Sequence, residues 1–365
     1  MDPFIPGLLD RIAPPRKVAL FRASRLGDFI CATPAFRALR QRLPDAEFTL
    51  VGLPFVEPLA ARLSSLNRFF AFPGSPGIAE QLFETRKLRA FLERMRAEEF
   101  DLVIQMHGSG VCANPITLEF GGRITAGYVR HGDSPGRLEA AFPYPAGEHE
   151  VKKVLALTRF LGAPSADKRL DFPLLAADQQ SAAQLLDRAR SPLIGVHARA
   201  EAKTKRWSPE RFAVAASRLA LSCEGSVVLV GSGSSEGHDE LIRRLDAPFL
   251  DLCGRTSLGS LGALLSRLSV LLTNDSGPAH IAYALGVPSV TVFGSTLPSE
   301  WASTSVARHA AVVHPIGCRP CDFDICPIGY QCLAQVSTDQ VVLAAQKVMN
   351  VHGKSGPIQA NAGSI

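Results

Sequence analysis

The sequence predicts an α/β protein built from two successive doubly wound domains. The chain has 365 residues, which is more than one compact core usually organises. Short apolar runs alternate along it with stretches of helical apolar spacing, and this scheme occurs twice. Alternation of this kind implies parallel strands with helices on both faces of each sheet. We therefore expect two Rossmann-like domains in tandem.

The first half contains five short runs with the composition of strands, separated by helical spacing. The runs are residues 17–23, 47–52, 68–72, 100–108 and 124–129. The expected helices between them include residues 30–43 and 80–98.

The second half repeats the scheme with strands that are nearly continuous in apolar residues, as parallel strands buried on both faces are. The predicted strands are residues 193–198, 226–232, 249–254, 269–275 and 288–294. The predicted helices are residues 209–221, 236–245, 257–267, 278–285 and 337–350.

The segment 163–180 is rich in Pro, Ala and Asp and is predicted to link the two domains. This gives an N-terminal domain over residues 1–170, a C-terminal domain over 171–350 and a flexible tail over 351–365. Two such domains are expected to face each other across a cleft. Ligands of doubly wound sheets bind at the carboxyl ends of the strands, so the loops after strands are the places to search for chemistry.

The formal net charge is +5 and is unevenly distributed. Residues 1–170 contain 23 Lys and Arg against 18 Asp and Glu, and the remainder contains 16 of each. Either an anionic partner or a solvated basic face explains the excess. No nucleic-acid-binding motif is found, and no apolar run is long enough to cross a bilayer. The N-terminus has no signal-peptide pattern, so a cytoplasmic protein is expected.

Asp28 follows the first predicted strand, in the segment SRLGDFICATPAFRALR. Gly27 allows a tight turn, which places Asp28 where the next helix is expected to begin. A carboxylate there can cap the helix or face its N-terminus, or it can accept a proton from an incoming hydroxyl as a general base. The spacing alone favours the capping role. The fingerprint GxGxxG is absent, which argues against NAD.

The strand 269–275 is followed by a predicted anion site. Small and polar residues gather in its loop and in the next one, namely Asp275, Ser276, Gly277, His280 and Thr296. Pro278 suits the first helical position, and the backbone N–H groups of this turn with the helix dipole suit a diphosphate. The alternative is an ordinary Asp/Ser cap followed by a histidine on the helix face.

The loop after strand 193–198 reads HARAEAKTKRWSPERF. A lysine there can reach a phosphate and neutralise it in place of a metal ion. Lys205, beside Trp207, is the candidate for this role, whereas Lys203 is as well explained by a solvated loop. Glu236 is placed to accept hydrogen bonds from ribose hydroxyls, although an acid at a helix start explains it equally well.

Four cysteines cluster near the C-terminus in the pattern C-x2-C-x4-C-x5-C. They are Cys318, Cys321, Cys326 and Cys332. Structural zinc, reduced thiols that brace a loop and disulfides all fit four cysteines, although a reducing cytoplasm disfavours disulfides. No histidine base lies among them, so the cluster is predicted to be structural.

Together these segments resemble glycosyltransferase family 9, the ADP-heptose:lipopolysaccharide heptosyltransferases. The matching segments are FRASRLGDFICATPAFRALR, HEVKKVLALTRFLGAP, KTKRWSPERF, LTNDSGPAHIAYALGVPSVTVFGST and CRPCDFDICPIGYQC. They extend from about residue 18 to residue 332 and occur in the family's order. The resemblance implies a GT-B fold and an inverting, metal-independent transfer from a nucleoside-diphosphate sugar, in the first instance ADP-heptose.

The resemblance also implies roles for individual residues. Asp28 becomes the general base and Lys205 the ligand of the donor phosphate. The implied donor-binding residues are Asp275, Ser276, Gly277 and His280, with Glu236 as a nucleoside contact. The implied acceptor is an anionic glycolipid at the inner face of the membrane, bound by the N-terminal domain. Neither a nucleic acid nor a stable protein partner is implied.

The segments QMHGSG (105–110) and EFGG (119–122) differ from the best-known heptosyltransferases, so the sequence leaves the acceptor open. A transferase that uses another NDP-sugar is one alternative. A sugar-nucleotide epimerase on the same double fold is another, and a nucleotide-binding protein without catalysis is a third. His107 is the next candidate for the base if Asp28 is only a cap.

Overall fold

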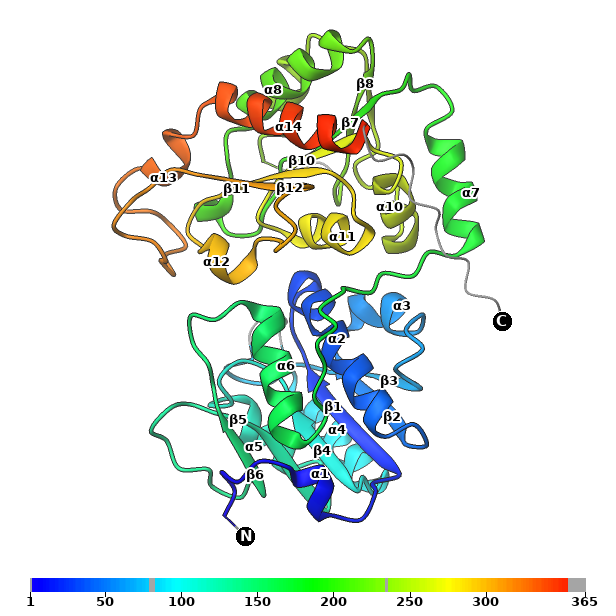
Figure 1. Ribbon diagram of the computed structural model, residues 1–365, viewed down its shortest axis with the longest axis vertical. Helices are drawn as coiled ribbons and strands as arrows, with labels where there is room; N and C mark the ends of the chain where they lie inside the picture. Colours follow the sequence, from blue (N-terminus) through cyan, green and yellow to red (C-terminus); the bar gives the residue numbers. More distant parts are fainter. Residues whose placement is uncertain (1, 79–82, 234–235, 354–365) are drawn as a thin grey trace. The chain divides into compact units, whose positions relative to one another are not determined.

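The computed structural model describes residues 2–78, 83–233 and 236–353. Contacts divide the chain into two compact units, Met1–Pro173 and Leu174–Ile365, where the sequence predicted a boundary after residue 170. Each unit contains a six-stranded sheet (Figure 1). All neighbouring strands in both sheets run parallel, so the predicted doubly wound α/β class is confirmed.

The sheet of the first unit has the strand order β3-β2-β1-β4-β5-β6. Its strands are β1 (Lys17–Arg22), β2 (Glu47–Gly52), β3 (Arg68–Ala71), β4 (Leu102–Gln105), β5 (Ile124–Val129) and β6 (Ala140–Pro143). β6 was not predicted. It is a four-residue edge strand that ends in a proline, and such a segment lacks the β-branched and aromatic run by which strands are found.

The helices of the first unit lie between these strands. They are α1 (Leu8–Arg11), α2 (Leu26–Arg42), α3 (Glu57–Ala60), α4 (Thr85–Ala97), α5 (Ala113–Leu118) and α6 (Glu150–Leu161), with a 3-10 turn η1 (Pro54–Val56). α4 corresponds to the predicted helix 80–98, of which residues 80–82 lie outside the described residues. α2 begins four residues before the predicted start at residue 30 and packs beside α6 (Figure 1).

The sheet of the second unit has the order β12-β11-β10-β7-β8-β9. Its strands are β7 (Leu193–His197), β8 (Ser226–Leu229), β9 (Phe249–Asp251), β10 (Val270–Asn274), β11 (Ser289–Phe293) and β12 (His309–Val313). β12 was missed as well. It is again an edge strand, its sequence HAAVV is rich in alanine, and only two of its five residues are buried.

The second unit has eight helices among its described residues and a 3-10 turn η2 (Lys203–Lys205). They are α7 (Ala176–Leu185), α8 (Pro209–Ser222), α9 (His238–Arg243), α10 (Leu258–Leu265), α11 (Gly277–Leu285), α12 (Pro298–Trp301), α13 (Gln331–Ala334) and α14 (Thr338–Gly353).

Two predicted boundaries are wrong. The predicted linker 163–180 runs into α7, whose Ala- and Gln-rich sequence favours a helix and whose Asp178 carboxylate accepts a hydrogen bond from the Leu175 N–H at 2.9 Å. The predicted tail 351–365 begins too early, because α14 continues to Gly353. Residues 354–365 lie outside the described residues.

The two sheets reverse their strand order at equivalent places, between β1 and β4 in the first unit and between β7 and β10 in the second. Loops diverge at such a switch point and leave room for a ligand at the carboxyl ends of the strands. Of the predicted site residues, Asp28 follows β1, Lys205 follows β7 and Asp275 follows β10. None of the helices within residues 2–78, 83–233 and 236–353 has the length and apolar character needed to span a bilayer.

Candidate active site

Lys205 and Asp275 form the centre of the site in the second unit. Lys205 closes the turn η2 in the loop after β7, and Asp275 follows β10 directly. The Lys205 ammonium lies 2.9 Å from Oδ2 of Asp275, and the Thr296 hydroxyl donates to the same oxygen at 2.7 Å. Three loops after neighbouring strands thus meet at one carboxylate.

The surroundings of Asp275 stabilise its charged form. Its side chain is only 4% exposed, and burial alone would raise its pKa. The charges of Lys205 and His280 and the hydrogen bonds from Lys205 and Thr296 outweigh burial, and the pKa is lowered. Lys205 is 28% exposed, so the pair presents its cationic member to solvent.

The predicted phosphate turn lies beside this pair. Ser276 is the N-cap of α11, and Gly277 is the first helical residue, so Pro278 occupies the second position and not the predicted first one. The Ser276 hydroxyl lies 3.2 Å from Nδ1 of His197 and donates to the Asn274 carbonyl. The positive end of the α11 dipole lies after β10, and the Lys205 ammonium lies in the loop after the neighbouring strand β7. Both are therefore at the same edge of the sheet.

His280 is buried behind Asp275 and does not lie at the surface. It is 3% exposed, its Nε2 is 4.0 Å from Oδ1 of Asp275, and its ring makes edge contacts with Tyr283 and Trp301. This position suits a residue that supports Asp275.

Sequence reasoning missed His197, the last residue of β7. It is 7% exposed, and burial lowers its pKa to about 4, so the imidazole is neutral near pH 7. Its position at a strand end that faces the switch point is the signal that could have identified it.

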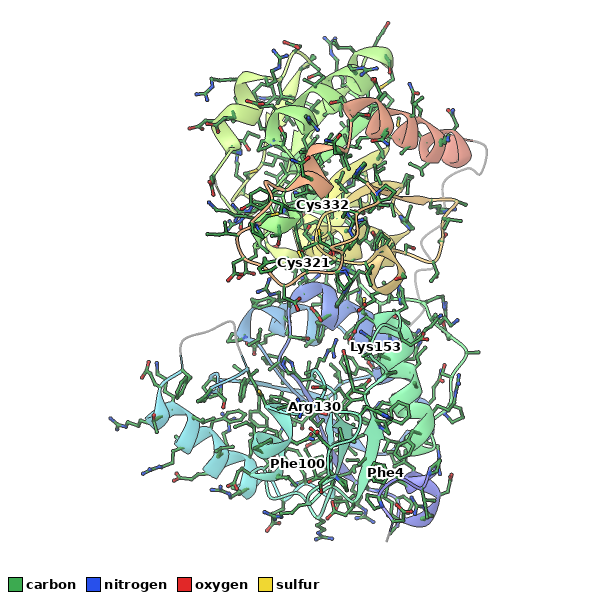
Figure 2. The ribbon with its side chains drawn as sticks, turned by 90° about the vertical axis from the view of Figure 1, so that its left-hand side faces the viewer. Phe4, Phe100, Arg130, Lys153, Cys321 and Cys332 are labelled. Atoms are coloured by element: carbon green, nitrogen blue, oxygen red, sulfur yellow. The ribbon has the colours of Figure 1, made fainter. Side chains whose placement is uncertain are left out.

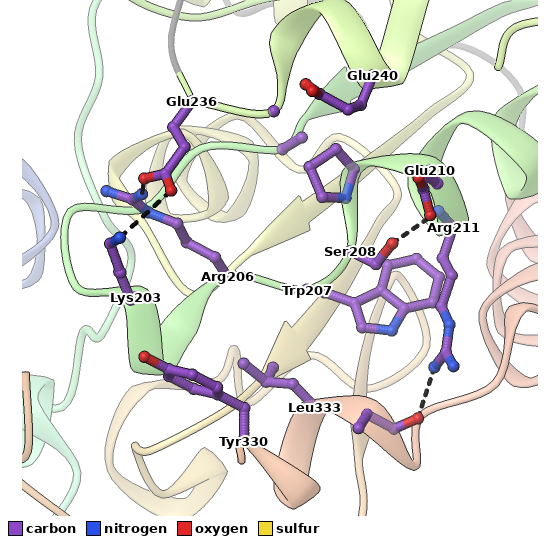
Figure 3. A pocket seen from close by; sticks show the side chains of 14 residues that line it. Lys203, Arg206, Trp207, Ser208, Glu210, Arg211, Glu236, Glu240, Tyr330 and Leu333 are labelled. Carbon is purple, nitrogen blue, oxygen red and sulfur yellow. Dashed lines mark hydrogen bonds and ion pairs between the residues drawn. The ribbon is translucent and has the colours of Figure 1, made fainter. Parts of the chain in front are cut away.

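Glu236 lies in a different surface pocket. The pocket has a volume of about 760 Å³, and its lining includes Lys203, Arg206, Tyr330 and Glu236 (Figure 3). Lys203 lies 3.3 Å and Arg206 3.0 Å from the exposed Glu236 carboxylate, whose pKa is lowered chiefly by the hydrogen bond from Lys203. Lys203 and Arg206 of this loop thus share Glu236 as a partner, whereas Lys205 between them pairs with Asp275.

Trp207 anchors the loop that carries these cations. Its side chain is fully buried, its indole N–H donates to the Val336 carbonyl at 3.1 Å, and its backbone N–H donates to the Asn274 side chain at 3.0 Å. The next residue, Ser208, caps α8 by accepting from the Arg211 N–H, and Pro209 is the first residue of that helix, as predicted. The loop is therefore fixed to the end of β10.

In the first unit, Asp28 is the third residue of α2, and Arg25 is the N-cap. The prediction that Asp28 itself caps the helix is wrong, because the helix starts earlier than expected. A carboxylate in the first turn still interacts favourably with the helix dipole. The Asp28 side chain is 30% exposed, and its Oδ1 lies 3.7 Å from the Arg22 guanidinium.

His107 follows β4, across the switch point from Asp28. Burial, together with the nearby charge of Arg22, lowers its pKa to about 4. Its Nδ1 is buried and has no hydrogen-bond partner among the described residues. The imidazole is neutral near pH 7.

The four cysteines of the C-terminal cluster are free thiols, and two of them, Cys321 and Cys332, are labelled in Figure 2. The Tyr330 N–H donates to the Cys326 sulfur at 3.2 Å. Within the described part of the chain, three metal-ligating atoms within 4.8 Å of one another occur only at His238, Asp251 and Cys253. No cysteine of the cluster belongs to that group.

The group of His238, Asp251 and Cys253, at β9, is explained by its own hydrogen bonds. The Asp251 carboxylate accepts from His238 at 2.9 Å and from the Cys253 N–H at 3.1 Å, and burial raises the pKa of the Cys253 thiol to about 12.

The family model described as glycosyltransferase family 9 (heptosyltransferase) matches residues 88–329, two thirds of the chain. The chain belongs to glycosyltransferase family 9. It is a glycosyltransferase.

Relatives match this glycosyltransferase over more than three quarters of its length. Lipooligosaccharide heptosyltransferase 2 of Campylobacter jejuni is 24% identical over 91% of this chain and 99% of its own. Lipopolysaccharide heptosyltransferase 2 of Salmonella typhimurium is 28% identical over 77% of this chain and 84% of its own. The structure of Escherichia coli ADP-heptose LPS heptosyltransferase II is similar with a TM-score of 0.73 and 20% identity, covering 92% of this chain and 98% of that one. This likeness confirms the predicted GT-B fold.

Proposed function

We propose that this glycosyltransferase moves heptose from ADP-heptose to the core of lipopolysaccharide, with inversion at the anomeric carbon and without a catalytic metal ion. The observation that carries the proposal is the family 9 match over residues 88–329, which includes the Lys205–Asp275 pair and the start of α11. The relatives named above are heptosyltransferases, and the solved one is described as using ADP-heptose.

The donor is proposed to bind to the second unit. An ammonium group has three N–H donors, and Lys205 gives one to Asp275, so the others can bind diphosphate oxygens. The backbone at Ser276 and Gly277, at the positive end of α11, would bind the same anion. Glu236 is proposed as a ribose contact and Thr296 as a hydroxyl beside the phosphate. His280 completes the proposed donor-binding set indirectly, by holding Asp275.

The acceptor is proposed to bind to the first unit, where Asp28 serves as the general base. Asp28 would remove the proton of the acceptor hydroxyl while that oxygen attacks the anomeric carbon. The bond from this carbon to the diphosphate oxygen breaks, and the nucleoside diphosphate leaves with the bonding electrons. Lys205 would stabilise the negative charge that develops on the leaving group, a role that other enzymes give to a divalent cation.

The enzyme is proposed to work in the cytoplasm at the inner face of the membrane, where an anionic glycolipid would meet the more basic first half of the chain. We propose a bracing role for the cysteine loop, with its thiols reduced. The four sulfurs show no three-ligand cluster, so they do not fit a structural zinc without rearrangement.

A panel of nucleotide sugars tests the donor. A ligand that binds only the native state raises its melting temperature. ADP-heptose is expected to give the largest rise and to release ADP only when heptose-deficient lipopolysaccharide is added. Transfer to lipopolysaccharide from a different nucleotide sugar, with none from ADP-heptose, would overturn the choice of donor. Conversion of a nucleotide sugar without any acceptor would show an epimerase, and binding without turnover would show a nucleotide-binding protein.

A further inference from the structure

The first unit contains a chain of alternating charges beside Asp28 that the sequence did not predict. Arg22 ends β1 and is 3% exposed, and Glu150 begins α6 and is 4% exposed. The Arg22 guanidinium lies 2.6 Å from Oε1 of Glu150 and 3.7 Å from Oδ1 of Asp28. Lys153, one turn along α6 and labelled in Figure 2, lies 3.4 Å from the other Glu150 oxygen. The formal charges of the four side chains sum to zero.

Arg22 also binds two separate pieces of backbone. Its guanidinium donates to the carbonyl of Met106 after β4, and to the carbonyl of Asp28 at 3.2 Å. Because the guanidinium is rigid and planar, these bonds fix the first turn of α2 relative to β4 and α6. A buried ion pair is a costly way to stabilise a fold, since well-packed apolar residues of similar volume often do so as well or better. This cost points to a role other than stability.

We propose that Arg22 is a positioning residue for Asp28, and that Glu150 and Lys153 set how much of the Arg22 charge acts on the Asp28 carboxylate. The inference rests on the proposed role of Asp28 as the general base. Arg22 holds the first turn of α2, which carries the base, and favours the ionised carboxylate that can accept a proton. Glu150 weakens this influence by partly neutralising Arg22, and Lys153 in turn partly neutralises Glu150.

Outside this network, the titratable groups of the described residues that interact with Arg22 are His107 after β4, Tyr128 on β5 and Tyr144 after β6. A further cation, Arg25, stands at the N-cap of α2, three residues before Asp28. His107 is neutral near pH 7, and burial raises the pKa of both tyrosines, so these three carry no charge there. Arg37, further along α2, pairs instead with Asp167 and Asp171.

The test is the pH dependence of kcat, measured with ADP-heptose and heptose-deficient lipopolysaccharide, in the wild type and four variants. Arg22→Gln should lower kcat and move the acid limb of the profile up by about 1 pH unit, because an opposite charge within 4–6 Å lowers a carboxylate pKa by about 1–3 units. Lys153→Met should move the limb in the same direction by less, and Glu150→Gln in the opposite direction. Arg22→Lys keeps the charge but loses the planar donors, so kcat should fall while the limb stays in place.

A purely structural role predicts changes in melting temperature without this pattern of opposite shifts. If Arg22→Gln does not fold, Lys153→Met and Glu150→Gln carry the test through the signs of their shifts. Folded variants whose acid limbs all coincide with that of the wild type would overturn the inference. Asp28→Asn distinguishes failure of this inference from failure of the proposed function. An unchanged kcat in Asp28→Asn would refute the role of Asp28 as the general base. A large loss of kcat in Asp28→Asn, together with unshifted acid limbs in the other variants, would refute only the positioning network.

Discussion

The ammonium of Lys205 and the carboxylate of Asp275 form an ion pair of 2.9 Å that joins the loop after β7 to the end of β10. The two residues are 70 positions apart in the sequence. Asp275 is buried and holds the pair in place, whereas Lys205 is partly exposed and can take a further ligand. Several properties of the enzyme should depend on this division of roles.

Replacement of Lys205 by alanine should strongly impair use of the donor. Loss of a charge directed at the leaving group is expected to cost about 2–4 kcal/mol of transition-state stabilisation, a fall in kcat/KM of roughly 30- to 900-fold. Lys203→Ala is the matched control, because that exposed lysine forms a surface pair with Glu236 and its loss should change kcat/KM little. Equal kcat/KM values for the two variants would remove Lys205 from the donor site.

Asp275 should contribute stability that depends on pH. Its folded-state pKa lies below the unfolded value of about 3.9, so the contribution is complete above pH 4 and is lost as the pH falls through the folded pKa. Asp275→Asn should therefore lower the melting temperature at pH 7, and the difference from the wild type should shrink below pH 4. Asp133→Asn, at an exposed pair with Arg130, should show a small difference that does not vary in this way. A gap for Asp275→Asn that stays constant down to pH 2.5 would contradict the assignment.

Asp28→Asn should separate catalysis from helix stability. Asn is nearly isosteric with Asp, but its amide cannot accept the acceptor's proton, so kcat should fall by about 10²–10⁴-fold. The melting temperature should change only slightly, since Arg25 and not Asp28 occupies the N-cap position of α2 and a first-turn acid contributes roughly 0.3–1 kcal/mol. The donor Kd should be almost unaffected. A near-normal kcat would direct attention to His107 as the next candidate.

Activity should survive chelation. If Lys205 and the dipole of α11 neutralise the leaving group, dialysis against EDTA should leave kcat unchanged. The melting temperature of the dialysed enzyme is the control, because loss of a structural metal would lower it. The decisive measurement adds Mg²⁺ or Mn²⁺ back to the chelated enzyme. An immediate recovery of lost activity with either ion would refute the metal-free mechanism.

Much of the fold followed from the sequence because the signals are local. Apolar runs such as residues 193–198 and the helical spacing between them fix parallel strands and covering helices without knowledge of their partners. Edge strands gave no such signal. β6 and β12 are short, and their pairing with β5 and β11 depends on a neighbour that the local sequence does not reveal. The extent of α2 also escaped prediction, which is why Asp28 was expected to be a cap.

For the site, the sequence by itself determined which loops matter, because polar residues such as Asp28 and Asp275 directly after apolar strands must lie at the carboxyl edge of a sheet. The partners of these residues were decided only by the tertiary structure. Lys203 and Lys205 are two residues apart in one loop, yet one pairs with Glu236 and the other with Asp275. Arg22 meets Glu150 across 128 positions. Such pairs depend on which strands and helices become neighbours in the fold, and the separation of two residues along the chain does not encode that.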